Sequence, residues 1–348
     1  KDNDGVALGQ GGEYFLALLY IKNLGPMTSK ANVSDQWYDA LQRWHLELFL
    51  IPTCLLTLAT LLANPVLLAC ILLSHSLRQE TRYLLLANTL AADVLFVSLN
   101  LVSVVCNALE VAVLRVLCEL VTAGTVAAYC CAVLTVTLKV VDTYVAVRWP
   151  LRYHDLLPPA RTRKILAAVW LLAAMYPLSL VIVMEAMEGA TPDKSNVCLV
   201  LISVGNMGGE MTVGLHMYLT VGAFVCTALI LFCYFRLYWV TKTQGIWQNR
   251  YSRARVTLLA HGVLLLLYFG PGLVFTVELV LYQHRTVSQD VRVWINTVNM
   301  CVMVLLPRAC APYLYGLWYR DISQTLLAML RRHRSRRKNF LFLVSSRV

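Results

Sequence analysis

Two long stretches without a charged residue constrain the fold of this chain more than any other feature. Leu48 to Leu73 and Ile165 to Met184 contain no Asp, Glu, Lys, Arg or His. A helix needs about 20 mainly apolar residues to cross the hydrocarbon core of a bilayer, and each stretch supplies them. Only helices and closed barrels satisfy their backbone polar groups inside a membrane, and these runs lack the alternating pattern of barrel strands. The sequence therefore predicts an all-α integral membrane protein.

The composition supports this interpretation. Of 348 residues, 59% are hydrophobic and 14% are charged, whereas about a quarter of a soluble domain is charged. Five further segments are long enough to span a membrane and contain one to three polar interruptions. They are residues 83–108, 116–148, 211–235, 256–277 and 293–317. The sequence thus predicts a bundle of seven transmembrane helices within residues 46–317.

The distribution of Lys and Arg predicts the orientation of the bundle, because positive residues are retained on the cytoplasmic side. With the N-terminus outside, 20 of the 30 Lys and Arg residues lie on the inner side, eight lie on the outer side, and Lys139 and Arg308 lie within the membrane. We therefore expect an outer N-terminus and a multi-pass protein of the plasma membrane. The net charge of +11 then reflects topology and attraction to anionic lipid, and no nucleic-acid partner is expected.

The outer segments carry candidate modification sites. Residues 1–45 are mostly polar and are expected to form an extracellular segment, in which Asn32 begins an Asn-Val-Ser glycosylation sequon. Of the eleven cysteines, nine lie in predicted helices, whereas Cys118 and Cys198 face the oxidising compartment. We expect these two to form a disulfide bond.

A set of motifs recurs in order along the predicted helices. They are Asn64 in the first helix, Asp93 in the second, Cys118 and Asp142 in the third, Trp170 in the fourth, Pro271 in the sixth, and "APYLY" (Ala311–Tyr315) at the end of the seventh. Each is weak alone, but the ordered set resembles the rhodopsin-like G-protein-coupled receptors from about residue 46 to 330. The segments "VRWPLRY" and "RARVTLLAHGVLLLLYFG" are similar to those of the odorant-receptor branch.

The chain departs from this family at residues that normally operate its switch. The departures are Thr143 for the arginine of the Asp-Arg-Tyr motif, Ala311 for the asparagine of the Asn-Pro-x-x-Tyr motif, and Phe269 for the sixth-helix tryptophan. The resemblance implies a role in activation and G-protein coupling for the motif positions and a neighbouring lysine: Lys139, Asp142, Thr143, Tyr144, Pro312 and Tyr315. The departures put the usual activation switch in doubt without affecting the fold.

Two charges of opposite sign are expected to meet inside the bundle. In the resembled family the acid of the second helix, here Asp93, helps to hold a sodium ion, but Arg308 stands at a seventh-helix position that would face it. An unpaired charge at mid-membrane costs about 2.5–3.5 kcal/mol or more. We therefore expect an internal Asp93–Arg308 ion pair in place of sodium. The alternative is that Arg308 points into a water-filled cavity while Asp93 is protonated.

Lys139 is a second unusual charge, three residues before Asp142 and therefore on the same helical face. One interpretation is that Lys139 partly replaces the missing arginine as the cation facing the cytoplasmic crevice. The other is a local pair with Asp142, with the lysine stem extended toward the inner interface. Neither reproduces the planar fork of arginine, so coupling through the usual contact is expected to be weakened.

The resemblance also implies a ligand pocket between the outer halves of the third, fifth, sixth and seventh helices. Its candidate lining residues are Thr125, Val126, Tyr129, Tyr218, Gly222, Phe269, Gly272, Thr276, Cys301 and Val304. Thr125 stands where amine receptors present an acid, so no anchor for an ammonium group is expected. A small apolar, lipid-like or odorant-like ligand fits this lining, with Tyr129 and Thr276 as hydrogen-bonding groups. Alternatively, any one of these residues serves packing alone.

The segment after the seventh helix is expected to lie along the membrane. Residues 318–332 place apolar side chains at helical spacing opposite Arg320 and Gln324, namely Ile322, Leu326, Leu327 and Leu330. This pattern predicts an interfacial amphipathic helix on the cytoplasmic side. The basic tail at residues 333–348 is expected to contact membrane lipid.

These features favour a receptor that transmits binding of a small extracellular ligand to heterotrimeric G proteins. The rival is a receptor-like protein that no longer couples and acts as a decoy or as a homo- or heterodimer partner. A transporter or channel would use the buried charges as an ion path, but the sequence has no paired broken helices or inverted repeat. It also has no metal-spaced His/Cys set, phosphate loop or nucleophile motif, so no enzyme activity, cofactor or metal is expected.

Overall fold

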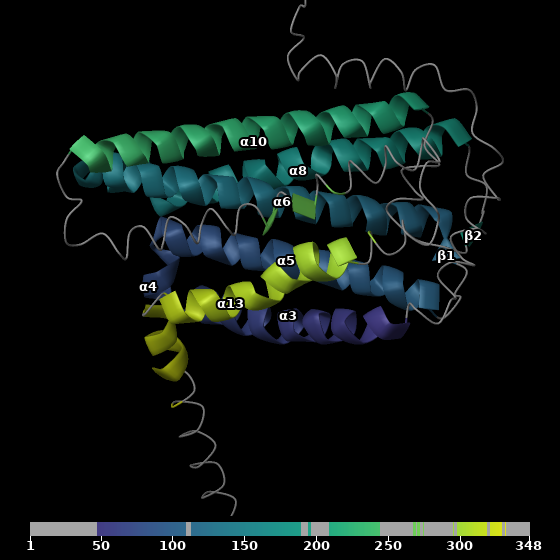
Figure 1. Ribbon diagram of the computed structural model, residues 1–348, viewed down its shortest axis with the longest axis horizontal. Coiled ribbons are helices and arrows are strands. Elements are labelled where there is room, and N and C mark those ends of the chain that lie inside the picture. Colours follow the sequence, from purple (N-terminus) through teal and green to yellow (C-terminus); the bar gives the residue numbers. More distant parts are fainter. Residues whose placement is uncertain are drawn as a thin grey trace, which may run out of the picture.

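The computed structural model describes most of the predicted bundle. The described residues are 47–108, 113–188, 194–195, 209–243, 267–268, 270–271, 274, 295, 298–318, 321–328 and 331. Five long helices of this part run side by side (Figure 1). They are α3 (Glu47–Leu73), α5 (Thr81–Ala108), α6 (Arg115–Arg148), α8 (Pro159–Glu188) and α10 (Gly209–Thr243). Each contains a span long and apolar enough to cross a membrane.

The remaining two predicted spans are described in part. Of the predicted sixth helix, Leu267, Tyr268, Gly270, Pro271 and Val274 are described, and all five are helical. We refer to these five residues as the sixth-helix segment. The predicted seventh helix consists of a π-helical stretch, η3 (Asn299–Leu305), that leads into α13 (Leu306–Trp318).

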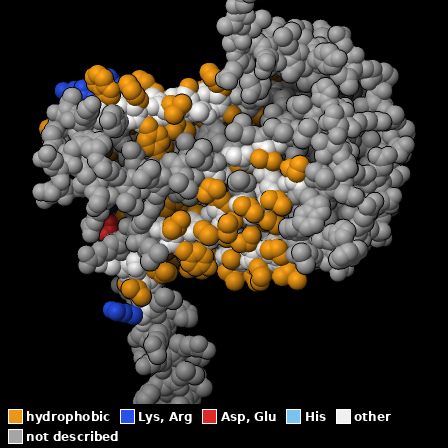
Figure 2. All heavy atoms as spheres, in the orientation of Figure 1, with side chains coloured by type: hydrophobic (Ala, Val, Ile, Leu, Met, Phe, Trp, Pro, Cys, Tyr) orange, Lys and Arg blue, Asp and Glu red, His pale blue; other side chains and the backbone are white. Residues whose placement is uncertain are grey.

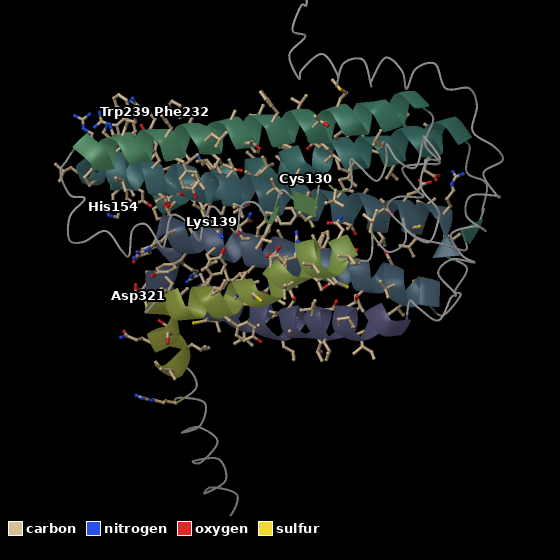
Figure 3. The ribbon with its side chains drawn as sticks, viewed as in Figure 1. Cys130, Lys139, His154, Phe232, Trp239 and Asp321 are labelled. Atoms are coloured by element: carbon tan, nitrogen blue, oxygen red, sulfur yellow. The ribbon has the colours of Figure 1, made fainter. Side chains whose placement is uncertain are left out.

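Short elements close the two ends of the bundle. The helices α4 (His75–Arg78) and α7 (Tyr153–Leu156) lie at one end, where α7 follows the single turn η2 (Pro150–Arg152) (Figures 1 and 3). At the other end, the two-residue strands β1 (Val113–Leu114) and β2 (Lys194–Ser195) pair antiparallel. In the orientation predicted from Lys and Arg, the first end is cytoplasmic and the second is outside.

The helices differ in how deeply they lie within the bundle. In the most apolar window of α6, 56% of the residues are buried, against 17% in α10, so α6 is the central helix. Large hydrophobic side chains such as Leu62 on α3 and Phe224 on α10 are exposed, and Figure 2 shows how densely such side chains cover the visible described surface. Exposed apolar side chains suit a bundle whose solvent is lipid, since the membrane core is as apolar as they are.

A polar contact fixes α5, α6 and α8 to one another. The side-chain amide of Asn88 on α5 donates to Thr135 Oγ1 on α6 over 2.8 Å, and Trp170 Nε1 on α8 donates to Asn88 Oδ1 over 2.8 Å. Both amide functions of this asparagine are therefore satisfied away from water, as buried polar groups require. Trp170, one of the ordered sequence motifs, thus has a packing role.

The amphipathic helix at residues 321–328 is docked onto the cytoplasmic end of the bundle. Ile322 is fully buried in a cluster with Ile71, Leu86 and Tyr315, and Leu326 packs against that cluster. The Tyr83 hydroxyl on α5 donates to Asp321 Oδ2 over 2.7 Å. Leu327, expected on the apolar face, is exposed instead.

Candidate functional site

A buried ion pair joins α5 to α13 in the interior. Arg308 Nε lies 3.0 Å from Asp93 Oδ1, and the two side chains are 1% and 0% exposed. The structure thus brings together the two charges that the sequence suggested as partners. The near-zero exposure of Arg308 is unlike a side chain that points into a water-filled cavity, and the charged state of Asp93 stays a prediction.

Three aromatic rings surround the guanidinium group of Arg308. Its central carbon lies 4.3 Å from the centre of the Phe96 ring, 5.1 Å from that of Tyr268 and 5.7 Å from that of Tyr129. A cation within about 6 Å of an aromatic face is attracted by the ring quadrupole, most strongly when water is excluded. The cage therefore lowers the cost of burying this charge in the membrane.

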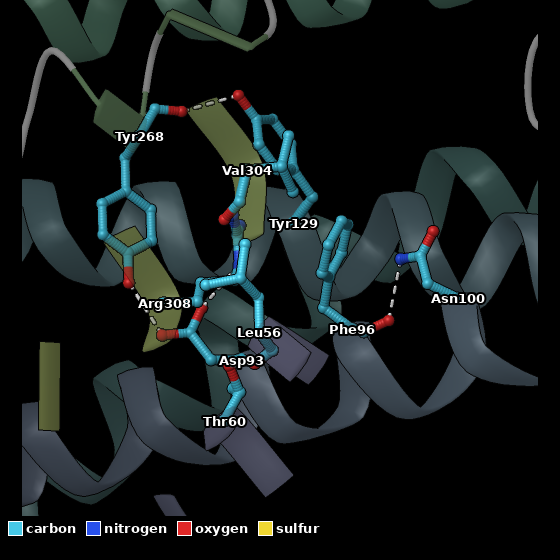
Figure 4. A network of polar contacts seen from close by, with 9 residues as sticks. All are labelled: Leu56, Thr60, Asp93, Phe96, Asn100, Tyr129, Tyr268, Val304 and Arg308. Carbon is cyan, nitrogen blue, oxygen red and sulfur yellow. Dashed lines mark hydrogen bonds and ion pairs between the residues drawn. The ribbon is translucent and has the colours of Figure 1, made fainter. Parts of the chain in front are cut away.

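Hydrogen bonds tie this cage to the sixth-helix segment (Figure 4). The Tyr268 hydroxyl donates to Asp93 Oδ2 over 2.7 Å, and the Tyr129 hydroxyl donates to the backbone carbonyl of Tyr268 over 2.6 Å. Arg308 Nη1 donates to the Val304 carbonyl in its own helix over 2.8 Å. We call Asp93, Phe96, Tyr129, Tyr268 and Arg308 the arginine centre; it connects α5, α6, α13 and the sixth-helix segment.

The ion pair depends on charge rather than on an aligned hydrogen bond. Asp93 Oδ1 and the Nε and Nη2 atoms of Arg308 have no hydrogen-bond partner among the residues that the structure describes. Their attraction is therefore Coulombic, and it is strong because the surroundings have a low dielectric constant. The sequence pointed to the two charges, but nothing in it singled out Phe96 or the hydroxyl of Tyr268.

The cytoplasmic end of α6 differs from the expected local pairing. The Asp142 carboxylate accepts a hydrogen bond from the Tyr153 hydroxyl over 2.8 Å, and the described part of the chain contains no ion pair between Asp142 and Lys139. Thr143 is occupied within α6, where its hydroxyl donates to the Lys139 carbonyl over 2.8 Å. Burial, followed by the bond to Asp142, raises the pKa of Tyr153, so this phenol remains a hydrogen-bond donor.

Lys139 reaches across to α13 instead. Its Nζ atom lies 3.4 Å from the Tyr315 hydroxyl and 4.9 Å from the centre of the Tyr315 ring; Figure 3 labels its place on α6. Tyr315 is buried, as is Pro312. The interpretation as a local Lys139–Asp142 pair is thus wrong for this structure, because the lysine side chain extends toward the seventh helix. No sequence signal linked the two residues, which are 176 positions apart.

Several residues of the predicted ligand pocket have their polar atoms engaged within the protein. Thr125 donates to the Val121 carbonyl over 2.8 Å, and Cys301 Sγ lies 3.0 Å from Thr53 Oγ1 on α3. Tyr218 donates to the Leu172 carbonyl on α8 over 2.7 Å.

The other predicted lining residues fall into two groups. Val126 is half-buried, Gly222 is exposed, and Val304 is buried against Phe96. Phe269, Gly272 and Thr276 lie outside the described residues.

The expected covalent modifications are described only at Cys118. Cys118 is disulfide-bonded, while nine other cysteines are free thiols. Cys198 and the sequon at Asn32 lie outside the described residues, so the pairing and the glycosylation stay predictions. Among the described residues, no group of three His, Cys, Asp or Glu side chains is placed to hold a metal ion.

Comparison with known proteins agrees with this architecture. Residues 63–315 match the family described as 7 transmembrane receptor (rhodopsin family). The chain belongs to the rhodopsin family of seven-transmembrane receptors. It is also 36% identical over 298 residues, 85% of either chain, to the human protein "Probable G-protein coupled receptor 148". The predictions of a seven-helix bundle and of a multi-pass plasma-membrane protein are thereby confirmed.

Proposed function

We propose that this rhodopsin-family receptor converts binding of a small apolar ligand in its outer half into a change of shape that a heterotrimeric G protein reads at the cytoplasmic face. The arginine centre carries this proposal, because it joins α5, α6, α13 and the sixth-helix segment at one buried point. A displacement of any one of these helices changes a charged contact there. Such a centre can hold a bundle in one arrangement and release it to another.

The preference for an apolar ligand rests on hydrogen bonds that are already made. The hydroxyls of Thr125, Tyr129 and Tyr218 each donate to a backbone carbonyl of the protein. A ligand that accepts hydrogen bonds would have to compete with these carbonyls for the hydroxyl protons, whereas an apolar ligand does not compete for them. The remaining contacts of such a site are apolar, as is usual for small-molecule pockets.

Weak or ligand-independent coupling is the expected form of signalling. Thr143 offers neither the charge nor the length of arginine, and its hydroxyl is engaged with Lys139. The ammonium group of Lys139, about one helical turn further into the membrane, contacts Tyr315. We infer that this contact between α6 and α13 does part of the work of the missing arginine.

Thr143 also favours a second candidate function. A chain without the arginine contact could be a non-coupling receptor that acts as a decoy or as a dimer partner, held in shape by the same arginine centre. The two candidates differ in whether a cytosolic partner ever binds.

The two candidates are separated by basal second-messenger levels, measured in cells that express the unmodified chain, Lys139→Met or Thr143→Arg. Coupling predicts a basal signal that falls with Lys139→Met, because the contact with Tyr315 is lost, and a stronger signal with Thr143→Arg. Arg148→Met, at the end of the same helix, is the matched control for removal of a cation. The same low signal from all four chains, together with no energy transfer to any G protein, would reject coupling in favour of the second candidate.

A further inference from the structure

Tyr268, in the sixth-helix segment, contacts three other residues of the arginine centre: Asp93, Tyr129 and Arg308. Its hydroxyl donates to Asp93 on α5, its carbonyl accepts from Tyr129 on α6, and its ring lies 5.1 Å from the guanidinium carbon of Arg308 on α13. The side chain is 1% exposed. Three different parts of one residue thus bind three different helices.

The helical hydrogen-bond pattern is incomplete next to Tyr268, and a side chain of another helix donates to the backbone there. Pro271, three residues further on, has no N–H group, so the carbonyl of Leu267, four residues before it, lacks its helical donor. A helix weakened in this way needs other partners for its carbonyls, and neighbouring side chains commonly supply them in membranes. The hydroxyl of Tyr129 donates to the adjacent carbonyl, that of Tyr268.

We propose that Tyr268 is a positioning residue that clasps the sixth-helix segment to the Asp93–Arg308 pair, and that its hydroxyl is the release point of this clasp. The bond to Asp93 is charge-assisted and wholly buried, which makes it stronger than the neutral bond from Tyr129. Breaking it removes this bond between the segment and α5, and leaves both Asp93 oxygens without a hydrogen bond among the described residues. The clasp is made by side chains and backbone of the chain itself, and it forms without ligand or G protein.

The same geometry indicates how a ligand would act on the clasp, and this step rests on the proposed function. Tyr129 belongs both to the predicted ligand pocket and to the arginine centre. A ligand that displaces the Tyr129 ring moves the hydroxyl that holds the Tyr268 carbonyl. The sixth-helix segment then loses this hydrogen bond to α6, while the contacts of Tyr268 with Asp93 and Arg308 remain.

Tyr268→Phe tests the clasp, because it removes the hydroxyl and keeps the ring next to Arg308. The matched control is Tyr313→Phe, an exposed tyrosine on α13. Purified receptors in lipid nanodiscs are compared by hydrogen–deuterium exchange of the peptides that cover residues 256–277. We expect about tenfold faster exchange in Tyr268→Phe, as the loss of one hydrogen bond to a charged group predicts, with unchanged exchange in the α8 peptide at 165–182. Tyr313→Phe should match the unmodified protein.

Two further results decide between a clasp and general loosening. Tyr268→Phe should speed exchange less in an Asp93→Asn background than in the unmodified chain, because the asparagine still accepts from Tyr268 but no longer carries the charge that strengthens the bond. The clasp is overturned if Tyr268→Phe speeds exchange in the α8 peptide as much as in the peptides that cover residues 256–277. It is also overturned if those peptides exchange at the same rate in Tyr268→Phe and in Tyr313→Phe. If exchange responds as expected while basal signalling does not, the clasp stands and the proposed coupling fails.

Discussion

Replacing Asp93 by Asn tests the charge balance of the arginine centre. The substitution keeps the size of the side chain and an acceptor for the Tyr268 hydroxyl, but it leaves the Arg308 charge without a carboxylate. Arg308 is 1% exposed, so water does not take the place of the carboxylate. Removing one partner of a buried ion pair costs about 3–5 kcal/mol. Because three aromatic faces remain around the guanidinium, each able to contribute about 0.5–2 kcal/mol, we expect a loss near the lower end.

Removing both charges should restore much of the stability. In Asp93→Asn combined with Arg308→Met, the methionine fills the cage with an apolar chain and no buried charge is left alone. Replacement of a buried pair by apolar groups is often neutral, so the double variant should recover at least about half of the lost free energy. Arg308→Met alone should lose less than Asp93→Asn, since a stranded carboxyl can bind a proton.

Thermal unfolding of the purified receptor measures these differences, because the buried thiols of Cys131 and Cys233 react with a fluorogenic reagent only after unfolding. With about 2.1 cal/mol/K of unfolding entropy per residue, a loss of about 3 kcal/mol lowers the melting temperature of a chain of this length by roughly 4 °C. The control is Arg82→Met, whose pair with Glu80 is about half exposed and should contribute less than about 1 kcal/mol. The ion pair would be refuted as a stabilising contact if Asp93→Asn had the same melting temperature as Arg82→Met. It would also be refuted if the double variant were less stable than Asp93→Asn. Stabilisation of the unmodified receptor by sodium would also count against it.

Three smaller predictions concern other parts of the chain. Alanine at Cys118 or at Cys198 should reduce surface expression to a similar degree, with little further loss in the double variant, and mass spectrometry that finds both as free thiols would contradict the disulfide. Tyr153→Phe should lower the free energy of unfolding by about 1–3 kcal/mol, because the buried Asp142 loses a donor; an unchanged melting temperature would show that the bond contributes nothing. Asn32→Gln should abolish a glycosidase-sensitive mobility shift in electrophoresis, and a shift that persists places the glycan elsewhere.

The sequence alone determined the membrane spans and the family. Hydrocarbon imposes a length of about 20 apolar residues on each helix, a local requirement that can be read directly from the residues. The second span was therefore predicted at 83–108 and is found as α5, Thr81–Ala108. The pairing of Asp93 with Arg308 was also foreseeable, because a lone charge in the membrane is costly enough to require a partner.

Only the tertiary structure decided which groups complete these sites. Phe96, Tyr129 and Tyr268 surround Arg308 because helices far apart in sequence pack at one depth, and no local pattern encodes that depth. Lys139 illustrates the same limit: its spacing from Asp142 allowed a local pair, yet its side chain contacts Tyr315. Spacing along a helix specifies the face on which a residue lies, whereas the partner on that face depends on how the neighbouring helices are placed around it.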